Sequence, residues 1–437
     1  MSAFKKLSLE LKVALAAAAV LFSMVVSRTY LIDNIESVTR MRLFRVQFLV
    51  LVNVLMLIGS LYIWKRTVVF KSSQAAQSCC LSVWKLCVLL FLTLAHCSFF
   101  TLILLVGEEP YLFAQVAYTC LGAYVILLFW LFVLGCLEQC HRLLLRGRVT
   151  KTAMLNGRNV SKVTLAVAVT VVLTVIGLLN GSRPPAITRV EIPVHRLPKS
   201  FDNMKMVLIS DIHLGPTVGK TKLEVIVKMV NNLKPDVIVI VGDLVDSQVV
   251  NLKSAVEPLK DLKSNLGTYF VTGNHEYYTV DVDNWFKHLQ SLNIHPLHNE
   301  NAKIFSTTSI NDWICLAGVD DIEAAVLRYP GHGMNLEKAL NGCSQSDVIV
   351  LLAHQPRAAK WALETRPDIS LVLSGHTHGG QMFPLTIGAY LMNPFFAGLY
   401  KVGESSYVYV TTGTIYYGIP MRLASRSEIV EIILQSH

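Results

Sequence analysis

Hydrophobic residues follow two different patterns along the 437-residue chain. Up to about residue 182 they form five long apolar stretches, whereas beyond Pro184-Pro185 they form short runs that alternate with amphipathic segments. A helix needs about 20 apolar residues to cross a bilayer, and roughly 17 is the practical minimum. The long stretches therefore predict five membrane-spanning helices, at approximately 13–27, 46–64, 86–106, 114–137 and 163–179.

The first apolar stretch is the shortest of the five. It reaches spanning length only if Leu9, Leu11 and the aliphatic stem of Lys12 extend it. A signal peptide is the alternative, but Ser27-Arg28 is a poor cleavage site and further apolar stretches follow. We therefore expect a retained helix.

The second half of the chain alternates two kinds of short segment. Runs rich in β-branched residues predict strands at 189–194, 206–210, 237–241, 268–271, 314–317, 348–352, 369–373, 407–410 and 429–434. Apolar residues at helical spacing predict helices at 223–233, 252–262 and 285–292. Several strands are almost wholly apolar, as in a sheet that is covered on both faces. This alternation predicts a layered α/β domain.

Composition supports a chain that is part membrane protein. The sequence is 53% hydrophobic and only 16% charged, compared with about 25% charged in an ordinary soluble domain. We expect a multi-pass α-helical membrane region over residues 1–182, a linker with the first strand over 183–200, and the α/β domain over 201–437.

The excess of basic over acidic residues lies wholly in the apolar half of the chain. Residues 1–182 contain 17 Lys+Arg and 6 Asp+Glu, which leaves 22 and 24 for the rest of the chain. Basic residues that flank apolar spans set membrane topology. A nucleic-acid-binding protein would instead carry a basic patch on its folded domain, so we expect a bilayer and no nucleic acid as partner. The oligomeric state is left open.

Charged loops also predict an orientation. The loop between the third and fourth stretches has Glu108 and Glu109 and no basic residue, whereas the next loop is strongly basic. Its basic residues are Arg142, Arg146, Arg148, Lys151, Arg158 and Lys162. Positive loops remain cytoplasmic, so five helices place the second half in a lumen or outside the cell. Four arginines oppose this topology, because it puts them in an outer loop: Arg28, Arg40, Arg42 and Arg45.

Isolated polar and sulfur-bearing residues leave several alternatives open. Asn53, His96 and Gln115 lie in apolar stretches, where hydrogen bonds between helices or a span end are better explanations than a transport site. Cys315 and Cys343 are the only cysteines beyond residue 183, and spacing does not decide whether they pair.

Polar residues with metal-binding side chains follow five of the predicted strands. They are Asp211 and His213, then Asp243, then Asn274, His275 and Glu276, then His354, and finally His376 and His378. A single Asp after a strand is usually a helix cap, and a single His is usually structural. Five strand ends in succession favour a shared site instead.

The chemistry of this residue set predicts two divalent ions. Oxygen and nitrogen ligands without thiolates suit Mn, Fe or Zn. The set exceeds the needs of one tetrahedral site, and a carboxylate such as Asp243 can bridge two ions. Two ions about 3.5–4 Å apart can clamp a phosphate and activate water.

The motif series D-x-H, G-D, G-N-H-E, H and G-H-x-H resembles the calcineurin-like metallophosphoesterase superfamily over roughly residues 200–437. The ending GHTHGGQ is similar to a branch with membrane-associated bacterial phosphodiesterases. The resemblance implies a two-sheet β-sandwich of αββα type. It implies one metal on Asp211, His213, Asp243 and His378, and a second on Asp243, Asn274, His354 and His376. It also implies that His275 contacts the substrate phosphate and protonates the leaving oxygen.

These observations predict a membrane-anchored phosphomonoesterase or phosphodiesterase in which a metal-bridging hydroxide attacks phosphorus directly. A lipid-linked phosphate is one expected substrate, because the enzyme is tethered to a membrane. A catalytically silent metal-binding scaffold is the alternative, and a transporter is a third hypothesis. Glu276 is expected either to orient His275 or to be solvated, and Gly379-Gly380 to permit close backbone approach near the metals or to be ordinary turn residues.

Overall fold

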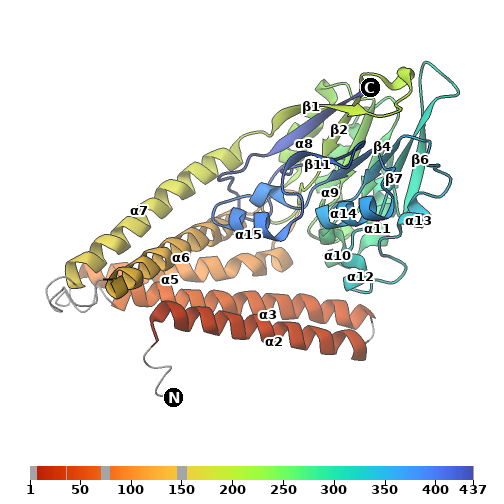
Figure 1. The fold of residues 1–437 in the computed structure, drawn as a ribbon. Helices are drawn as coiled ribbons and strands as arrows, with labels where there is room; N and C mark the ends of the chain where they lie inside the picture. Colours follow the sequence, from red (N-terminus) through yellow and green to blue (C-terminus); the bar gives the residue numbers. More distant parts are fainter. Residues whose placement is uncertain (1–6, 36, 70–78, 145–154, 437) are drawn as a thin grey trace. The chain divides into compact units, whose positions relative to one another are not determined.

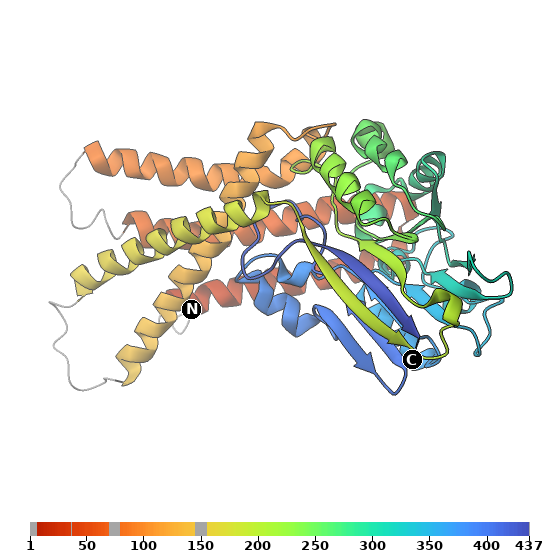
Figure 2. The same ribbon diagram turned by 90° about the horizontal axis from the view of Figure 1, so that it is seen from above.

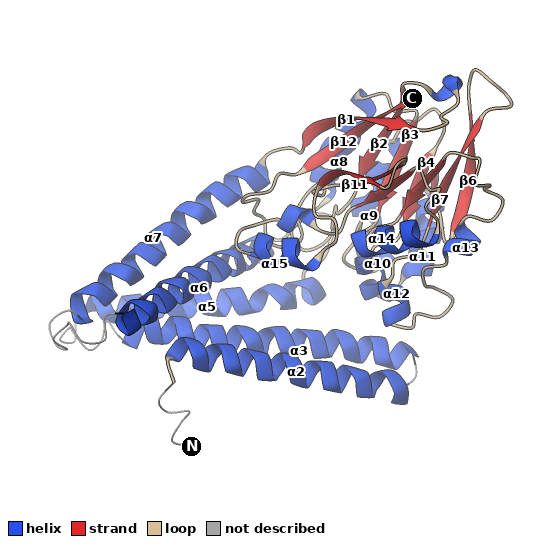
Figure 3. Cartoon of the chain, viewed as in Figure 1, coloured by secondary structure: helices blue, strands red, loops and turns tan. Residues whose placement is uncertain are grey.

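The computed structural model describes residues 7–35, 37–69, 79–144 and 155–436. The chain divides into two compact units. One contains Met1–Phe100 and Val116–Ile176, and the other contains Thr101–Gln115 and Gly177–His437. Helices make up the first unit, and strands with covering helices make up most of the second (Figure 3).

Long apolar helices lie mostly in the first unit. Five helices among the described residues are long and apolar enough to cross a membrane, with spans at Leu9–Tyr30, Leu43–Val68, Leu81–Leu104, Leu112–His141 and Ser161–Ser182. They belong to α2 (Leu9–Asn34), α3 (Ser37–Trp64), α5 (Cys79–Leu104), α6 (Leu112–Leu144) and α7 (Leu155–Ser182) (Figure 1). The π-helical turn η1 (Lys65–Val69) continues α3. The prediction of five long apolar helices is confirmed, and the first one extends to Leu9 as expected.

Polar side chains inside these helices bond to neighbouring helices. His96 of α5 contacts Asn53 of α3 through Nδ1 at 3.0 Å and Ser60 of α3 through Nε2 at 3.0 Å. Hydrogen bonding between helices, rather than a transport site, therefore explains Asn53 and His96. Gln115 lies at a span end. Three of the basic loop residues, Arg146, Arg148 and Lys151, lie outside the described residues, so the orientation stays a prediction.

The second unit is built from two six-stranded sheets. The strands of the first sheet, in spatial order, are β1 (Ala186–Val194), β12 (Glu428–Ser436), β2 (Met204–Ile209), β3 (Val237–Val241), β4 (Thr268–Val271) and β5 (Ile294–Pro296). Those of the second sheet are β10 (Gly398–Val402), β11 (Ser406–Val410), β9 (Leu371–Ser374), β8 (Ile349–Leu352), β7 (Trp313–Gly318) and β6 (Glu300–Phe305). Strands β1 and β12 lie side by side along the sheet edge, although they are far apart in sequence (Figure 2).

Alternating side chains sort the strands into layers. In β2, Met206 and Leu208 join the core between the two sheets, whereas Val207 and Ile209 face the helices. Helices α8 (Lys220–Asn232), α9 (Val249–Val256) and α11 (Val282–Ser291) cover the first sheet. Helices α13 (Leu336–Ala339) and α14 (Pro356–Thr365) cover the second. The predicted αββα sandwich is confirmed.

Three strands were not predicted from the sequence. Strand β5 has three residues and includes Pro296, and β6 and β10 carry exposed polar positions at sheet edges. Cys315 of β7 forms a disulfide with Cys343, which follows α13; their Cα atoms are 6.1 Å apart. This pairing had been left open.

Parallel pairing of strands brings the loops that carry the predicted site residues together. Strands β2, β3 and β4 are parallel neighbours in one sheet, and β8 and β9 are parallel neighbours in the other. The carboxyl ends of parallel strands meet at one edge, so the loops after these five strands lie close together.

Candidate metal centre

The loops after β2, β3, β4, β8 and β9 bring together all eight residues expected in the site. Asp211 and His213 follow β2, and Asp243 follows β3. Asn274 and His275 begin α10 (Asn274–Thr279), directly after β4. The remaining three, His354, His376 and His378, follow β8 and β9. Their roles as ligands stay predictions, whereas their proximity is a feature of the fold.

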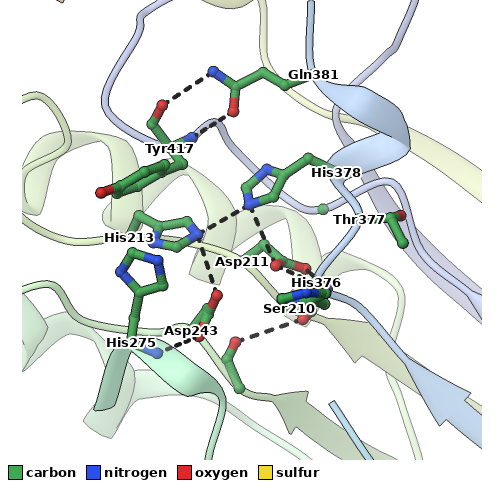
Figure 4. Close-up of polar contacts among 12 residues, drawn as sticks. Ser210, Asp211, His213, Asp243, His275, His376, Thr377, His378, Gln381 and Tyr417 are labelled. Atoms are coloured by element: carbon green, nitrogen blue, oxygen red, sulfur yellow. Dashed lines mark hydrogen bonds and ion pairs between the residues drawn. The ribbon is translucent and has the colours of Figure 1, made fainter. Parts of the chain in front are cut away.

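One group of donors surrounds His213. Its Nε2 lies 3.0 Å from His378 Nε2 and 3.7 Å from Asp243 Oδ2 (Figure 4). Asp211 Oδ1 lies 3.3 Å from His378 Nε2. These side chains point into one shared space from two sheets.

A second group of donors also includes Asp243. His354 Nε2 is 3.2 Å from Asp243 Oδ2, and His376 Nδ1 is 2.9 Å from Asn274 Oδ1. The donor atoms of Asp243, His354 and His376 all lie within 4.8 Å of one another. Asp243 therefore touches both groups and is the only residue in a bridging position among the described ligands.

Backbone conformation at the site is unusual. Five residues in the two donor groups have left-handed φ angles between 51° and 70°, namely Asp211, His213, Asp243, His376 and His378. Non-glycine residues seldom adopt this conformation, which costs of order 1–3 kcal/mol each and is concentrated at functional sites. The surrounding strands hold the chain in this conformation so that successive side chains face the same space.

Glycines allow the loops to approach the carboxylates closely. A Cβ atom on Gly273 would lie 2.2 Å from Asp243 Oδ1, and one on Gly375 would lie 2.4 Å from Asp211 Oδ2. Gly379 and Gly380 also permit close approach, but to Ser425 and Thr386 rather than to the ligands.

The electrostatics of the centre favour a bound cation. Burial lowers the pKa of His354, yet the carboxylates of Asp243 and Asp211 outweigh burial and raise it well above its usual value. Burial, followed by the charge of His354, lowers the pKa of His376 to about 3, so this ring is neutral. His354 Nδ1 contacts the Val241 carbonyl at 2.7 Å, and its buried Nε2 faces Asp243 Oδ2 at 3.2 Å. The carboxylates thus stabilise positive charge at this position, and the neutral His376 ring can ligate an ion.

The sequence did not identify Asp246 as part of the site. This buried carboxylate lies 2.9 Å from His213 Nδ1 and 2.8 Å from His275 Nδ1. It therefore orients one predicted ligand and the predicted acid. Its position three residues after Asp243 is the only sequence signal.

Glu276 performs neither of its two expected roles. It is fully buried, and its carboxylate accepts hydrogen bonds from the amides of Gly273, Asp243 and Leu244 at 2.6–2.9 Å. It holds two site loops together, whereas Asp246 orients His275.

Arg422 connects the metal centre to the end of α7. Its buried guanidinium donates to the His378 carbonyl at 2.7 Å and to the Thr412 carbonyl at 2.9 Å. Burial lowers its pKa to about 10. The backbone amide of Arg422 donates to Gly177 O at 3.0 Å, and its carbonyl accepts from Asn180 Nδ2 at 3.2 Å. The last turns of a predicted membrane span therefore pack beside a predicted ligand.

Comparisons with known proteins agree with this geometry. The profile of the calcineurin-like phosphoesterase family matches residues 204–380. The chain is 60% identical to the transmembrane protein with metallophosphoesterase domain of Bos taurus and 56% identical to that of Danio rerio, over the full length of each. It is 36% identical to an uncharacterized metallophosphoesterase of Helicobacter pylori, over 59% of this chain and 66% of the relative.

Proposed function

We propose, since this chain belongs to the calcineurin-like phosphoesterase family and carries membrane-spanning helices, that it hydrolyses phosphate esters at a dinuclear centre beside a bilayer. The observation that carries this proposal is the position of Asp243 between two groups of donors. One ion would be held by Asp211, His213, Asp243 and His378. The other would be held by Asp243, Asn274, His354 and His376.

The bound ions would neutralise the phosphate and lower the pKa of the attacking water. The side chains of this protein would position the ions and supply the proton for the leaving group. The left-handed backbone at five ligands fixes their positions before substrate arrives, which is the preorganisation that electrostatic catalysis requires. Mn, Fe and Zn all suit this set of oxygen and nitrogen donors.

His275 is the proposed general acid. Its Nδ1 is held by Asp246 at 2.8 Å, which leaves Nε2 to contact the phosphate or the leaving oxygen. Burial lowers the pKa of His275, but Asp243 and Asp246 outweigh burial and raise it to about 9. The ring therefore holds the proton that a departing alkoxide needs.

A lipid-linked phosphate is the substrate class that we propose. Helix α15 (Leu385–Met392) begins seven residues after His378 and buries none of its side chains. Tyr390 and Leu391 are 65% and 75% exposed. An adjacent groove is lined by the basic residues Arg357 and Lys360, by one acidic residue, Glu364, and by Trp361, together with the exposed end of α15. Exposed apolar, aromatic and basic side chains are the combination found at a membrane surface.

Contacts of the last residues of α7, within the second unit, also favour such a substrate. Residues Gly177–Ser182 end a predicted span, and they pack against Pro420, Met421 and Arg422. Phe383, just before α15, bonds through its amide to Leu423 O at 3.0 Å. The centre, α15 and the end of a span thus share one set of loops.

We propose a lumenal or extracellular position for this unit. The basic loop predicts it, and the Cys315–Cys343 disulfide supports it because disulfides persist in oxidising compartments. We also propose the domain boundaries that the sequence predicts. The membrane region ends at residue 182, a linker with the first strand covers residues 183–200, and the phosphoesterase domain begins at residue 201.

The test uses the full chain in detergent with Mn²⁺. We expect hydrolysis of bis-p-nitrophenyl phosphate, and its loss in Asp243→Ala, because that variant loses the bridging carboxylate. A screen in bilayers would compare lipid phosphates with nucleotides and phosphopeptides. A well-folded, metal-loaded chain without turnover on any of these would favour the scaffold alternative, and equal activity in Asp243→Ala would defeat the dinuclear assignment.

A further inference from the structure

A second cluster of histidines lies outside the dinuclear centre. We propose that His298, Asp320 and His332 bind a third divalent ion, of the Zn²⁺ class, that clasps the loops behind the catalytic residues. None of these residues belongs to the family motifs, and the proposal does not depend on the proposed function.

Three separate loops supply the cluster. His298 lies between β5 and β6, Asp320 follows β7, and His332 lies between α12 (Glu323–Val326) and α13. Asp320 is 1% exposed, and the side chain of His332 is 4% exposed. Only His298 reaches solvent appreciably, which gives an ion a path into the site.

The donor spacing suits a tetrahedral ion. A tetrahedral Zn²⁺ holds its ligands at about 2.0–2.2 Å, so the donors lie about 3.4 Å from each other. His298 Nδ1 is 2.7 Å from Asp320 Oδ1, and His332 Nδ1 is 3.5 Å from Asp320 Oδ2. All three donors lie within 4.8 Å of one another. Small side-chain adjustments would bring them to bonding distance.

Surrounding groups hold the rings as they are held around known metals. His332 Nε2 lies 3.4 Å from Asp283 Oδ1, so the nitrogen that faces away from the cluster has a carboxylate partner. Metal-ligating histidines almost always donate their second ring N–H in this way. The amide of Gly333 donates to Asp320 Oδ2 at 3.0 Å and fixes that carboxylate.

A fourth donor is within reach. The hydroxyl of Tyr277 lies 3.2 Å from His332 Nδ1, on the same nitrogen that faces Asp320. The rings of His298 and His332 have centroids 4.4 Å apart. Both rings direct Nδ1 at the carboxylate of Asp320. An ion would hold both Nδ1 atoms against Asp320, which now contacts them at 2.7 Å and 3.5 Å.

An ion here would stabilise the loop that reaches the catalytic centre. Asp321 follows Asp320 and accepts from Gln355 Nε2 at 2.8 Å, beside the predicted ligand His354. The Cys315–Cys343 disulfide closes the same stretch of chain, which contains both Asp320 and His332. The third ion is therefore a structural clasp next to the reaction site.

Metal counting on the full chain in detergent tests the proposal. Elemental mass spectrometry of the Zn²⁺-loaded protein should find three ions per chain, and His332→Ala should contain one fewer. The Asp243→Ala variant should also lose one ion when His332→Ala is added, because the third ion does not need the dinuclear centre. His295→Ala is the matched control, since this exposed histidine lies three residues from His298 and outside the cluster. It should keep three ions.

The result that overturns the proposal is equally concrete. A metal count in His332→Ala equal to that of the wild-type chain would show that the cluster is only hydrogen-bonded, whatever the number of ions at the other centre. If His332→Ala does not fold, the difference in metal count between the wild-type chain and the more exposed His298→Asn decides the question. Thermal unfolding gives a second measurement: added Zn²⁺ should raise the Tm of Asp243→Ala, and His298→Asn should reduce that rise.

Discussion

The proposed dinuclear centre and the cluster of His298, Asp320 and His332 use the same kinds of side chain in different settings. The residues of the proposed dinuclear centre follow strand ends, and five of them have left-handed backbone. The cluster of His298, Asp320 and His332, called the loop cluster below, is supplied by three loops. None of these three residues has a positive φ. Both are rich in His–Asp contacts. Composition alone would not separate them.

The difference in backbone conformation shows that backbone strain occurs at the proposed catalytic site and not at the loop cluster. A left-handed residue costs free energy, and that cost persists only where the rest of the fold compensates for it. At the strand ends it sets reacting groups in place. At the loop cluster ordinary backbone is enough, since an ion that only holds loops together does not require a fixed geometry in advance. Backbone strain, rather than residue type, therefore distinguishes the proposed catalytic ions from the proposed structural one.

Matched alanine variants at the two clusters should give the largest difference in turnover. His376→Ala should lower turnover of bis-p-nitrophenyl phosphate by about 10³-fold, because losing one ligand removes several kcal/mol of transition-state stabilisation. His332→Ala should leave turnover close to that of the wild-type chain. Steady-state kinetics on both proteins measures the contrast. Equal losses would mean that the two clusters act as one site.

Removing the disulfide should weaken the loop cluster and spare the dinuclear centre. Cys315→Ala/Cys343→Ala opens a loop with a sequence separation of 28 residues. It should lower the free energy of unfolding by about 3 kcal/mol, since the unfolded chain gains entropy. Chemical denaturation in detergent measures this change. Cys87→Ala, at a free cysteine, is the control. A variant as stable as the control would contradict the expected role of the disulfide.

The carboxylates that orient histidines in each cluster, Asp246 and Asp283, should give the smallest difference in kcat. Asp246→Asn should lower kcat by about 10- to 100-fold, as is typical when a group that orients a metal ligand is changed. Asp283→Asn is matched, because Asp283 also bonds a histidine ring, but in the loop cluster. It should leave kcat unchanged. Similar kcat values for the two variants would show that Asp246 does not orient the reacting groups.

The sequence predicted the parts of the fold that depend on local pattern. Apolar length defined the spans, and β-branched runs defined nearly all of the central strands, with 237–241 and 268–271 matching β3 and β4. Strands β5, β6 and β10 were missed because edge strands are short or polar. The pairing of β1 with β12 joins distant segments, which no local pattern encodes.

Site residues were found or missed for a similar reason. Asp211 and Asp243 stand within two residues of apolar strands, so their position in sequence indicates their position in space. Arg422 and His332 lie in loops without a periodic pattern, and only the folded chain brings them to a site. Glu276 was misread because its burial depends on contacts with Gly273 and Leu244 rather than on its neighbours in a helix.

Arg422 also limits how this protein can be divided. A fragment that began at Ala186 would retain every predicted ligand but would lack Gly177 O and Asn180, the partners of the Arg422 backbone. Its side chain supports the loop of His378. Such a soluble fragment would expose Pro420 and Met421 to water and loosen a ligand loop. Activity measured on it would understate that of the intact chain, so the shortest faithful version begins before Gly177.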